Sequence, residues 1–305
     1  EQLLDSKMKT LNKLYKMCFL LTVYISITSI PGYSQRTSFK EFLIDVDHAK
    51  LVVHVWAPES TDAETVFALP GSGADVSRYK DLGPILAEAG YKLIAINQRG
   101  ILGSSGNLDQ ITLRDLANDV IAIADKMGIE KFHMAGWAFG NRTSRMLATT
   151  YPERLASLIL IAAGGLVRPL TEAGELAKLL DDQTLSEDEK IHLARRTMFS
   201  PKTDISIIRD YVQSLTYWPE ARRGQSEANK NTPLEEWAAG GRGPVLMIMG
   251  KNDLTAPIEN GYLMKAEHGD RLTLIAIDDA GHAVGLEKPK EVAKGMIEFL
   301  QKHPI

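Results

Sequence analysis

KFHMAGWAFG, residues 131–140, is the stretch of sequence that decides the fold. Residues 131–135 form a short, mostly apolar run that predicts a buried strand, and the residues after the stretch predict a helix. Gly136 and Gly140 flank the connection between the two elements. Because neither glycine carries a Cβ, the backbones of strand and helix can approach until they nearly touch. The stretch therefore predicts a sharp strand–turn–helix junction with Ala138 in the turn.

The same alternation of apolar strands with amphipathic helices runs through most of the chain. The expected strands are 51–56, 65–69, 92–97, 131–135, 155–162, 245–250 and 272–277, and the expected helices are 77–89, 112–127, 139–150, about 256–266 and 288–302. Continuous apolar strands that alternate with helices indicate a mostly parallel sheet covered on both faces. We therefore predict an α/β fold with a central sheet flanked by helices.

Residues from about 166 to 241 interrupt this alternation. The segment is charged, favours helices and is poor in strand patterns, and its aromatic residues include Tyr211, Tyr217, Trp218 and Trp237. An insertion at this point follows the carboxyl end of a strand, which is where ligands bind in open α/β sheets. We expect a helical cap over the site. A peripheral subdomain that only stabilises the fold is the alternative.

The front of the chain has the pattern of a signal peptide. From Met8 onward, a basic stretch precedes an apolar run of 14 residues, 17–30, and the small residues Gly32 and Ser34 follow. The run is shorter than the roughly 20 residues that a membrane-spanning helix needs. The pattern predicts cleavage of a leader, and a buried N-terminal helix or a retained anchor is the alternative.

This leader sets the expected compartment. Residues 1–34, including those upstream of Met8, are expected to be removed near the bond between Ser34 and Gln35, which leaves residues 35–305 as a single domain. The lone cysteine lies within the leader, so the mature chain has no disulfide framework and no cysteine-built metal site. We expect a bacterial protein that is periplasmic or secreted.

The charge balance and the lack of cofactor motifs narrow the functional classes. The chain has 35 Lys and Arg against 39 Asp and Glu, a net charge of -4, which argues against binding to nucleic acid through bulk charge. It contains no HExxH, no phosphate-binding G-x-x-x-x-G-K and no EF-hand pattern. We expect no cofactor, no metal, no nucleic-acid partner and no membrane association after cleavage. The expected partner is a small, at least partly apolar substrate.

Two ionisable residues follow the last two expected strands. Asp253 lies in GKNDLTAP and His282 lies in DDAGHAVGLEKP. The chain order Ala138, Asp253, His282 is the order of nucleophile, acid and histidine in one class of triad enzymes. His133 lies inside an expected strand instead, and we expect it to be a hydrogen-bonded core residue.

These features together resemble the α/β-hydrolase superfamily. Residues 136–140 resemble its nucleophile elbow, G-x-S-x-G. LPGSGAD at 69–75 resembles the oxyanion loop, and NQRGILGSSG at 97–106 resembles the motif D-x-R-G-x-G-x-S. The similarity runs from about residue 42 to residue 300 apart from the expected cap. Each motif alone is weak, but four in order on a strand–helix framework are specific.

The resemblance implies roles for particular residues. Asp253 would orient His282 and stabilise its imidazolium. The backbone N–H groups of Ser72 and Phe139 would form the oxyanion hole, which stabilises negative charge on a tetrahedral intermediate. Because these donors are backbone groups, the side chain at the nucleophile position does not determine whether they are present.

The sequence departs from the family pattern at four positions. Alanine stands at the nucleophile position, 138, and Pro70 stands where the oxyanion loop usually has histidine. Asn97 replaces the aspartate of the third motif, and Leu102 replaces its second glycine. The methyl group of Ala138 cannot attack a carbonyl, so the acyl-enzyme route of serine hydrolases is closed to this sequence.

Three hypotheses follow from Ala138. The protein is a hydrolase-like enzyme in which His282, oriented by Asp253, acts as a general base without a serine nucleophile. Alternatively, it is a non-catalytic, ligand-binding pseudo-hydrolase that keeps the pocket. As a third alternative, the alanine is an engineered replacement in a serine esterase. The first is favoured, although fold-level analogy supplies much of that preference.

Overall fold

The computed structural model describes residues 39–170 and 172–305, and the expected leader, residues 1–34, lies outside them. Within the described ranges, no helix has both the length and the apolar character needed to cross a bilayer.

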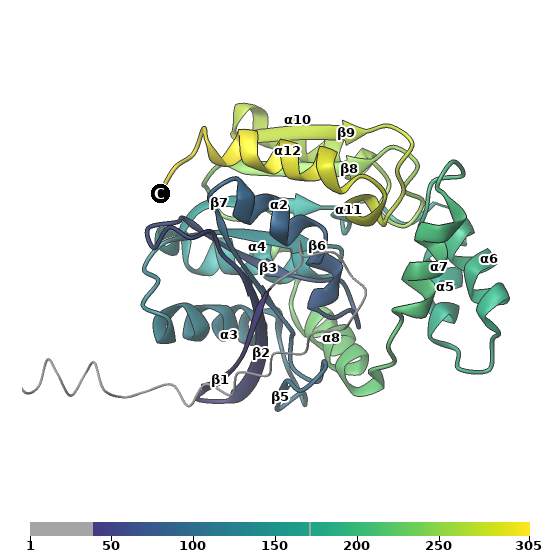
Figure 1. Ribbon diagram of the computed structural model, residues 1–305, viewed down its shortest axis with the longest axis horizontal. Helices are drawn as coiled ribbons and strands as arrows, with labels where there is room; N and C mark the ends of the chain where they lie inside the picture. Colours follow the sequence, from purple (N-terminus) through teal and green to yellow (C-terminus); the bar gives the residue numbers. More distant parts are fainter. Residues whose placement is uncertain (1–38, 171) are drawn as a thin grey trace, which may run out of the picture. The chain divides into compact units, whose positions relative to one another are not determined.

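A nine-stranded sheet forms the centre of the described chain (Figure 1). Its strands are β1 (Lys40–Val46), β2 (Ala49–Trp56), β3 (Thr65–Leu69), β4 (Lys92–Ile96), β5 (Ser105–Gly106), β6 (Phe132–Trp137), β7 (Leu155–Ile161), β8 (Val245–Gly250) and β9 (Leu272–Ile277). Their order is β1-β2-β4-β3-β6-β7-β8-β9, and β5 pairs with β2. The pairs that β2 makes are antiparallel, and all pairs from β4 to β9 are parallel. The predicted mostly parallel sheet is confirmed.

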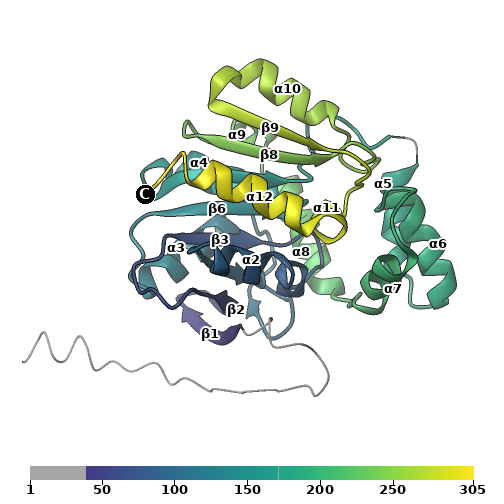
Figure 2. The same cartoon turned by 45° about the horizontal axis from the view of Figure 1, so that its top comes forward.

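Helices cover both faces of this sheet, also as predicted (Figure 2). One face packs against α3 (Leu113–Lys126), α4 (Gly140–Thr150), α8 (Pro219–Asn231), α9 (Leu234–Trp237) and α10 (Glu259–His268). The other packs against the 3-10 helix η1 (Val76–Tyr79), α2 (Leu82–Glu88), α11 (Val284–Glu287) and α12 (Pro289–Leu300). Alternate residues of β3 enter the two cores, since Phe67 faces the first and Ala68 the second.

Several elements differ from the predictions, and the short elements β5 and α11 were not expected. Strand β1 was not expected, because its apolar run, residues 42–44, is short and its residues alternate between exposed and half-buried at the edge of the sheet. The helix expected over 77–89 is divided into η1 and α2. By contrast, the helix expected over 288–302 is present as α12, and Val292, Met296, Phe299 and Leu300 are buried on it.

The helical segment between β7 and β8 has two parts. Helices α5 (Ala173–Lys178), α6 (Glu187–Thr197) and α7 (Ile205–Gln213), with the 3-10 helix η3 (Leu179–Asp181), form a lobe with its own apolar cluster, which stands to one side of the sheet (Figures 1 and 2). Helices α8 and α9 instead place Ala228 and Trp237 in the main core. We call residues 173–213 the cap lobe, and the segment expected as a cap over 166–241 is therefore wider than this lobe.

Candidate active site

The junction at Ala138 has the geometry that its two glycines predict. A Cβ on Gly136 would lie 2.5 Å from the carbonyl oxygen of Gly140, and a Cβ on Gly140 would collide with the carbonyl of Leu69. Ala138 itself has a φ of 49°, in the left-handed region that residues other than glycine rarely adopt. Such a conformation costs about 1–3 kcal/mol and persists only when the surrounding structure imposes it.

Asp253 and His282 are brought together from the loops that follow β8 and β9. The Nδ1 atom of His282 lies 2.8 Å from Oδ2 of Asp253, and both residues are buried. Since a carboxylate only accepts hydrogen bonds, Nδ1 carries the proton and Nε2 is left as the acceptor of a neutral ring. The other carboxylate oxygen accepts the backbone N–H groups of Thr255 at 2.8 Å and Ala256 at 2.7 Å. These bonds fix the carboxylate, and through it the ring.

The surroundings of His282 raise its affinity for a proton. Burial alone would lower the pKa of His282, but the charge of Asp253 and the hydrogen bond to it outweigh burial. The more distant charge of Glu287 acts in the same direction, and the net effect holds the pKa above its usual value. The imidazole is therefore a stronger base than an isolated histidine.

The loop of His282 also lies beside the turn of Ala138. The indole Nε1 of Trp137, the residue immediately before Ala138, donates a hydrogen bond of 3.2 Å to the carbonyl of His282. This bond joins the end of β6 to the loop that carries the histidine. The three residues expected from the nucleophile–acid–histidine order thus converge at the carboxyl edge of the sheet.

The two expected oxyanion donors flank the same turn. Phe139 directly follows Ala138, and a Cβ added to Gly71, next to Ser72, would lie 3.2 Å from the Cβ of Ala138. Within residues 39–170 and 172–305, the backbone N–H groups of Ser72 and Phe139 have no hydrogen-bond acceptor. Two unpaired donors beside one turn are the arrangement that an oxyanion hole requires.

His133, and Arg99 of the third motif, lie outside this site. His133 is fully buried in β6 with Nδ1 2.8 Å from Oγ of Ser157, as expected for a core residue. Arg99 makes two hydrogen bonds to Asp119, of 2.8 and 2.7 Å. Leu102, at the second glycine position of the third motif, has a φ of 27°, so the left-handed turn is kept without the glycine.

Sequence reasoning missed two residues that hold the loops of the site. Gln225 of α8 hydrogen-bonds Ser72 and Gly73, which lie more than 150 residues earlier. Glu287 of α11 accepts a hydrogen bond from the N–H of Gly281, the neighbour of His282. Glu287 is close to His282 in the sequence and could have been noticed there. No periodicity or motif marks Gln225, because its partners lie far from it in the sequence.

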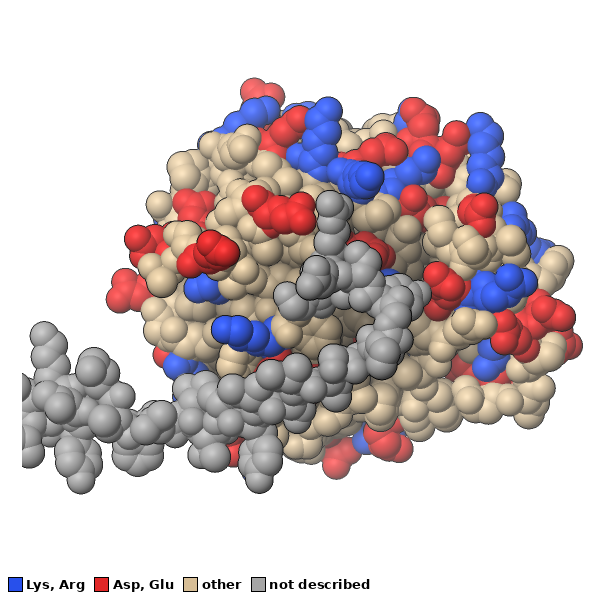
Figure 3. All heavy atoms as spheres, viewed as in Figure 1, with Lys and Arg blue, Asp and Glu red and all other residues tan. Residues whose placement is uncertain are grey.

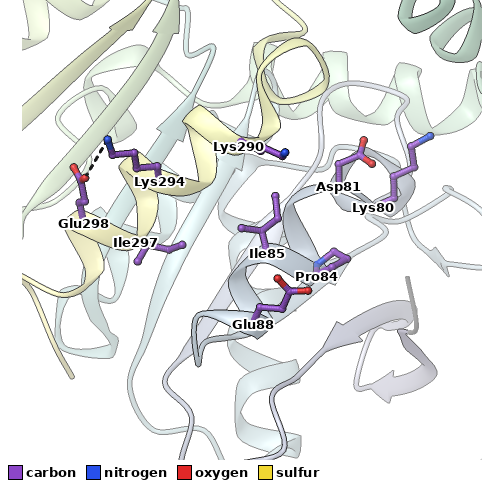
Figure 4. Close-up of a pocket in the computed structure, with 9 residues that line it drawn as sticks. All are labelled: Lys80, Asp81, Pro84, Ile85, Glu88, Lys290, Lys294, Ile297 and Glu298. Atoms are coloured by element: carbon purple, nitrogen blue, oxygen red, sulfur yellow. Dashed lines mark ion pairs between the residues drawn. The ribbon is translucent and has the colours of Figure 1, made fainter. Parts of the chain in front are cut away.

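A groove of about 610 Å³ lies elsewhere, between α2 and α12 (Figure 4). Its lining includes three lysines and three acidic residues around Ile85 and Ile297, and none of the site residues belongs to it. The face seen in Figure 3 likewise mixes basic and acidic side chains. Among the described residues, no group of three or more His, Cys, Asp or Glu side chains is placed to hold a metal ion.

Sheet order, covering helices and the strand–turn–helix junction define an α/β-hydrolase fold. Residues 66–188 match the family described as "alpha/beta hydrolase fold". Together with the structural likenesses below, this match agrees with the α/β-hydrolase fold of the described chain.

Individual hydrolases resemble the chain at low sequence identity. A 2-hydroxy-6-oxo-6-phenylhexa-2,4-dienoate hydrolase of Comamonas testosteroni is 26% identical over 264 residues, which cover 80% of this chain and 90% of that protein. The structure of carboxylesterase CesB from Bacillus subtilis has a TM-score of 0.72 at 16% identity, covering 86% of this chain and 92% of the other. An enol-lactonase from Burkholderia xenovorans LB400 has a TM-score of 0.69 at 19% identity, covering 85% and 99%. At these identities, the structural likeness concerns the fold.

Proposed function

We propose that the protein is a hydrolase-like enzyme that acts on a small, partly apolar substrate through His282 and Asp253, without a serine nucleophile. The supporting observation is the buried 2.8 Å hydrogen bond between His282 and Asp253, which leaves Nε2 of the ring as a base. The relatives named as hydrolases and esterases agree with this chemistry in general terms.

The proposed reaction uses water as the nucleophile. Nε2 of His282 takes a proton from a water molecule while the water oxygen attacks the substrate carbonyl carbon, and the carbonyl electron pair moves onto its oxygen. The N–H groups of Ser72 and Phe139 bind this oxyanion. When the tetrahedral intermediate collapses, the bond to the leaving group breaks and the imidazolium returns its proton to that group. Triad enzymes that lack one member keep about 10³–10⁴-fold catalysis over water, so a site without the serine is not inert.

Turnover measurements on the unaltered protein and on His282→Ala test this proposal. The panel contains esters, lactones, thioesters and 2-hydroxy-6-oxo-6-phenylhexa-2,4-dienoate, the last because the Comamonas testosteroni relative is named for it. We expect turnover of at least one compound by the unaltered protein and its loss in His282→Ala. His192→Ala is the matched control, since His192 is exposed on α6. Equal turnover in His282→Ala and the unaltered protein contradicts the proposal.

Ala138 favours a second candidate function, a non-catalytic binding protein. Ala138 lacks the hydroxyl oxygen that the serine mechanism needs. The turn, the Asp253–His282 pair and the N–H groups of Ser72 and Phe139 are retained. This candidate predicts that a compound of the panel stabilises the protein against heat without being consumed. The codon for residue 138 in the source gene separates both candidates from an engineered serine-to-alanine exchange, which requires a serine codon there.

A further inference from the structure

The side chain of Gln225 connects α8 to the loop that carries Ser72. Its Oε1 accepts hydrogen bonds from the Ser72 hydroxyl at 2.9 Å and from the Gly73 backbone N–H at 2.8 Å. Its Nε2 donates a hydrogen bond of 2.9 Å to Oε1 of Gln98, which follows β4. Gln225 and Gln98 are both buried, at 3% and 4% exposure. One amide therefore joins α8, the oxyanion loop and the end of a central strand.

The orientation of this amide is fixed by its partners. A backbone N–H can only donate, so Gly73 requires the oxygen of Gln225, and the nitrogen must then face Gln98. The same constraint leaves Nε2 of Gln98 buried without a hydrogen-bond partner among the described residues. A buried polar network with an unsatisfied donor stabilises a core less well than apolar packing does. Stability alone therefore does not account for two glutamines at these positions.

The turn at Gly73 has no room for a side chain of its own. Gly73 has a φ of 61°, and a Cβ there would collide with the guanidinium of Arg222, one turn before Gln225 on α8. Helix α8 thus lies directly on the turn that follows Ser72. The Ser72 N–H lies in the Gly71–Ser72 peptide plane, which is joined to the Ser72–Gly73 peptide plane at the Cα of Ser72. Its direction therefore depends on how that turn is held.

We propose that Gln225 is a positioning residue, which holds the Ser72–Gly73 turn so that the Ser72 N–H faces the reacting carbonyl oxygen. This inference rests on the proposed function of Ser72 as an oxyanion donor. It assigns α8 to the active-site wall and not to the cap. Helix α8 lies within residues 166–241, which were expected as a cap, so part of that segment contributes to transition-state stabilisation. The cap lobe, with helices α5 to α7, does not contribute through this contact.

The experiment compares Gln225→Met, which keeps the length of the side chain and removes all three hydrogen bonds, with Gln225→Glu, which keeps an acceptor for Gly73. The first readout is amide hydrogen exchange at Gly73 in the full protein. We expect Gln225→Met to speed this exchange at least about 10-fold, since a buried N–H loses its acceptor. Gln225→Glu is expected to leave it within about 3-fold of the parent, because the acceptor remains.

The second readout is hydrolysis of p-nitrophenyl acetate in an Ala138→Ser background. Gln225→Met is expected to lower kcat at least about 10-fold with KM changed less than about 3-fold, as for an interaction made only in the transition state. Gln213→Met is the matched control, since Gln213 is exposed on α7 and contacts only Glu187. A role limited to folding would lower the unfolding temperature without this separation of kcat from KM.

Unchanged Gly73 exchange in Gln225→Met overturns the proposal, and so does an unchanged kcat in a folded protein. If the unaltered protein turns over no compound of the panel and the Ala138→Ser background hydrolyses no ester, the oxyanion role of Ser72 fails with the proposed function. Gly73 exchange still decides in that case whether Gln225 holds the loop, so the two failures are distinguishable.

Discussion

Glu287 accepts a hydrogen bond of 2.7 Å from the backbone N–H of Gly281, the residue immediately before His282. Its other oxygen accepts the N–H of Ser200 at 2.7 Å and the hydroxyl of Thr203, which connect α6 to α7 in the cap lobe. A single carboxylate therefore ties the cap lobe to the loop of the histidine. The cap lobe is anchored at this point, beside the loop of His282.

Replacing Glu287 by glutamine is expected to destabilise the protein. Both carboxylate oxygens accept a backbone N–H, so either position of the glutamine nitrogen places two donors face to face. We expect a loss of about 1–3 kcal/mol in the free energy of unfolding, measured by urea denaturation. Glu291→Gln, at an exposed position of α12, is the control and should change the value by less than about 0.5 kcal/mol.

The same variant alters the pH dependence of stability. Burial raises the pKa of Glu287, so the folded chain holds this proton more tightly than the unfolded chain does. The free energy of unfolding then falls as pH rises from the ordinary glutamate value of 4.5 toward the raised value. Glu287→Gln should remove this contribution, and an unchanged slope over that range would show that Glu287 does not titrate as described.

Asp253→Asn is expected to lower the pKa of His282. Without the carboxylate charge, burial of the imidazole acts largely unopposed and disfavours the protonated ring. In the unaltered protein, the raised pKa of His282 contributes stability below 6.5 that is lost as pH rises through the folded value. NMR titration of the ring measures the shift, with Asp278→Asn as a control, because Asp278 pairs with Lys251 at the surface. A raised or unchanged pKa in Asp253→Asn contradicts the electrostatic argument.

Ala138→Ser is expected to gain acyl transfer from p-nitrophenyl esters. The serine hydroxyl would occupy a turn that already has the required backbone conformation, beside the loop of His282. A second substitution, His282→Ala, should lower this activity at least about 10³-fold, as expected when a triad loses its base. Ala239→Ser, at an exposed position, should show no gain. A folded Ala138→Ser protein without ester turnover would argue against the assigned nucleophile position.

Gly140→Ala is expected to destabilise the protein through backbone crowding. Its Cβ would collide with the carbonyl groups of Leu69 and Pro70, which cannot move without displacing β3. We expect a loss of about 1–3 kcal/mol, typical of an overpacked site, measured by urea denaturation. Gly243→Ala is the matched control, because no atom lies within 4 Å of its added Cβ. Equal stability of the two variants would mean that the junction is looser than described.

Residues 1–34 are expected to be removed by signal-peptide cleavage when the gene is expressed in a bacterium that exports the protein. The basic stretch, the apolar run and the small residues Gly32 and Ser34 support this prediction. N-terminal sequencing of the periplasmic or secreted protein should begin at Gln35. Full-length protein that stays in the cytoplasm or the membrane fraction would favour a buried helix or a retained anchor instead.

The sequence was sufficient where local pattern and long-range packing agree. Strand β8 is buried along its whole length and β9 is mostly apolar, so the bounds of both could be predicted to the residue. Strand β1 could not be predicted, because an edge strand buries little and needs no apolar run. The contact of Gln225 with Gly73 depends on how α8 crosses the sheet, and a single sequence does not contain that information in any local pattern.

The backbone at Ala138 also affects how easily the protein could change its chemistry. Its left-handed conformation is present with a methyl group, and no hydroxyl, on the side chain. Alanine and serine differ by one oxygen atom, and their codon families GCN and TCN by one base. A single transversion would therefore supply a hydroxyl to a turn that needs no rebuilding, so this scaffold lies one mutational step from a chain with serine at that turn.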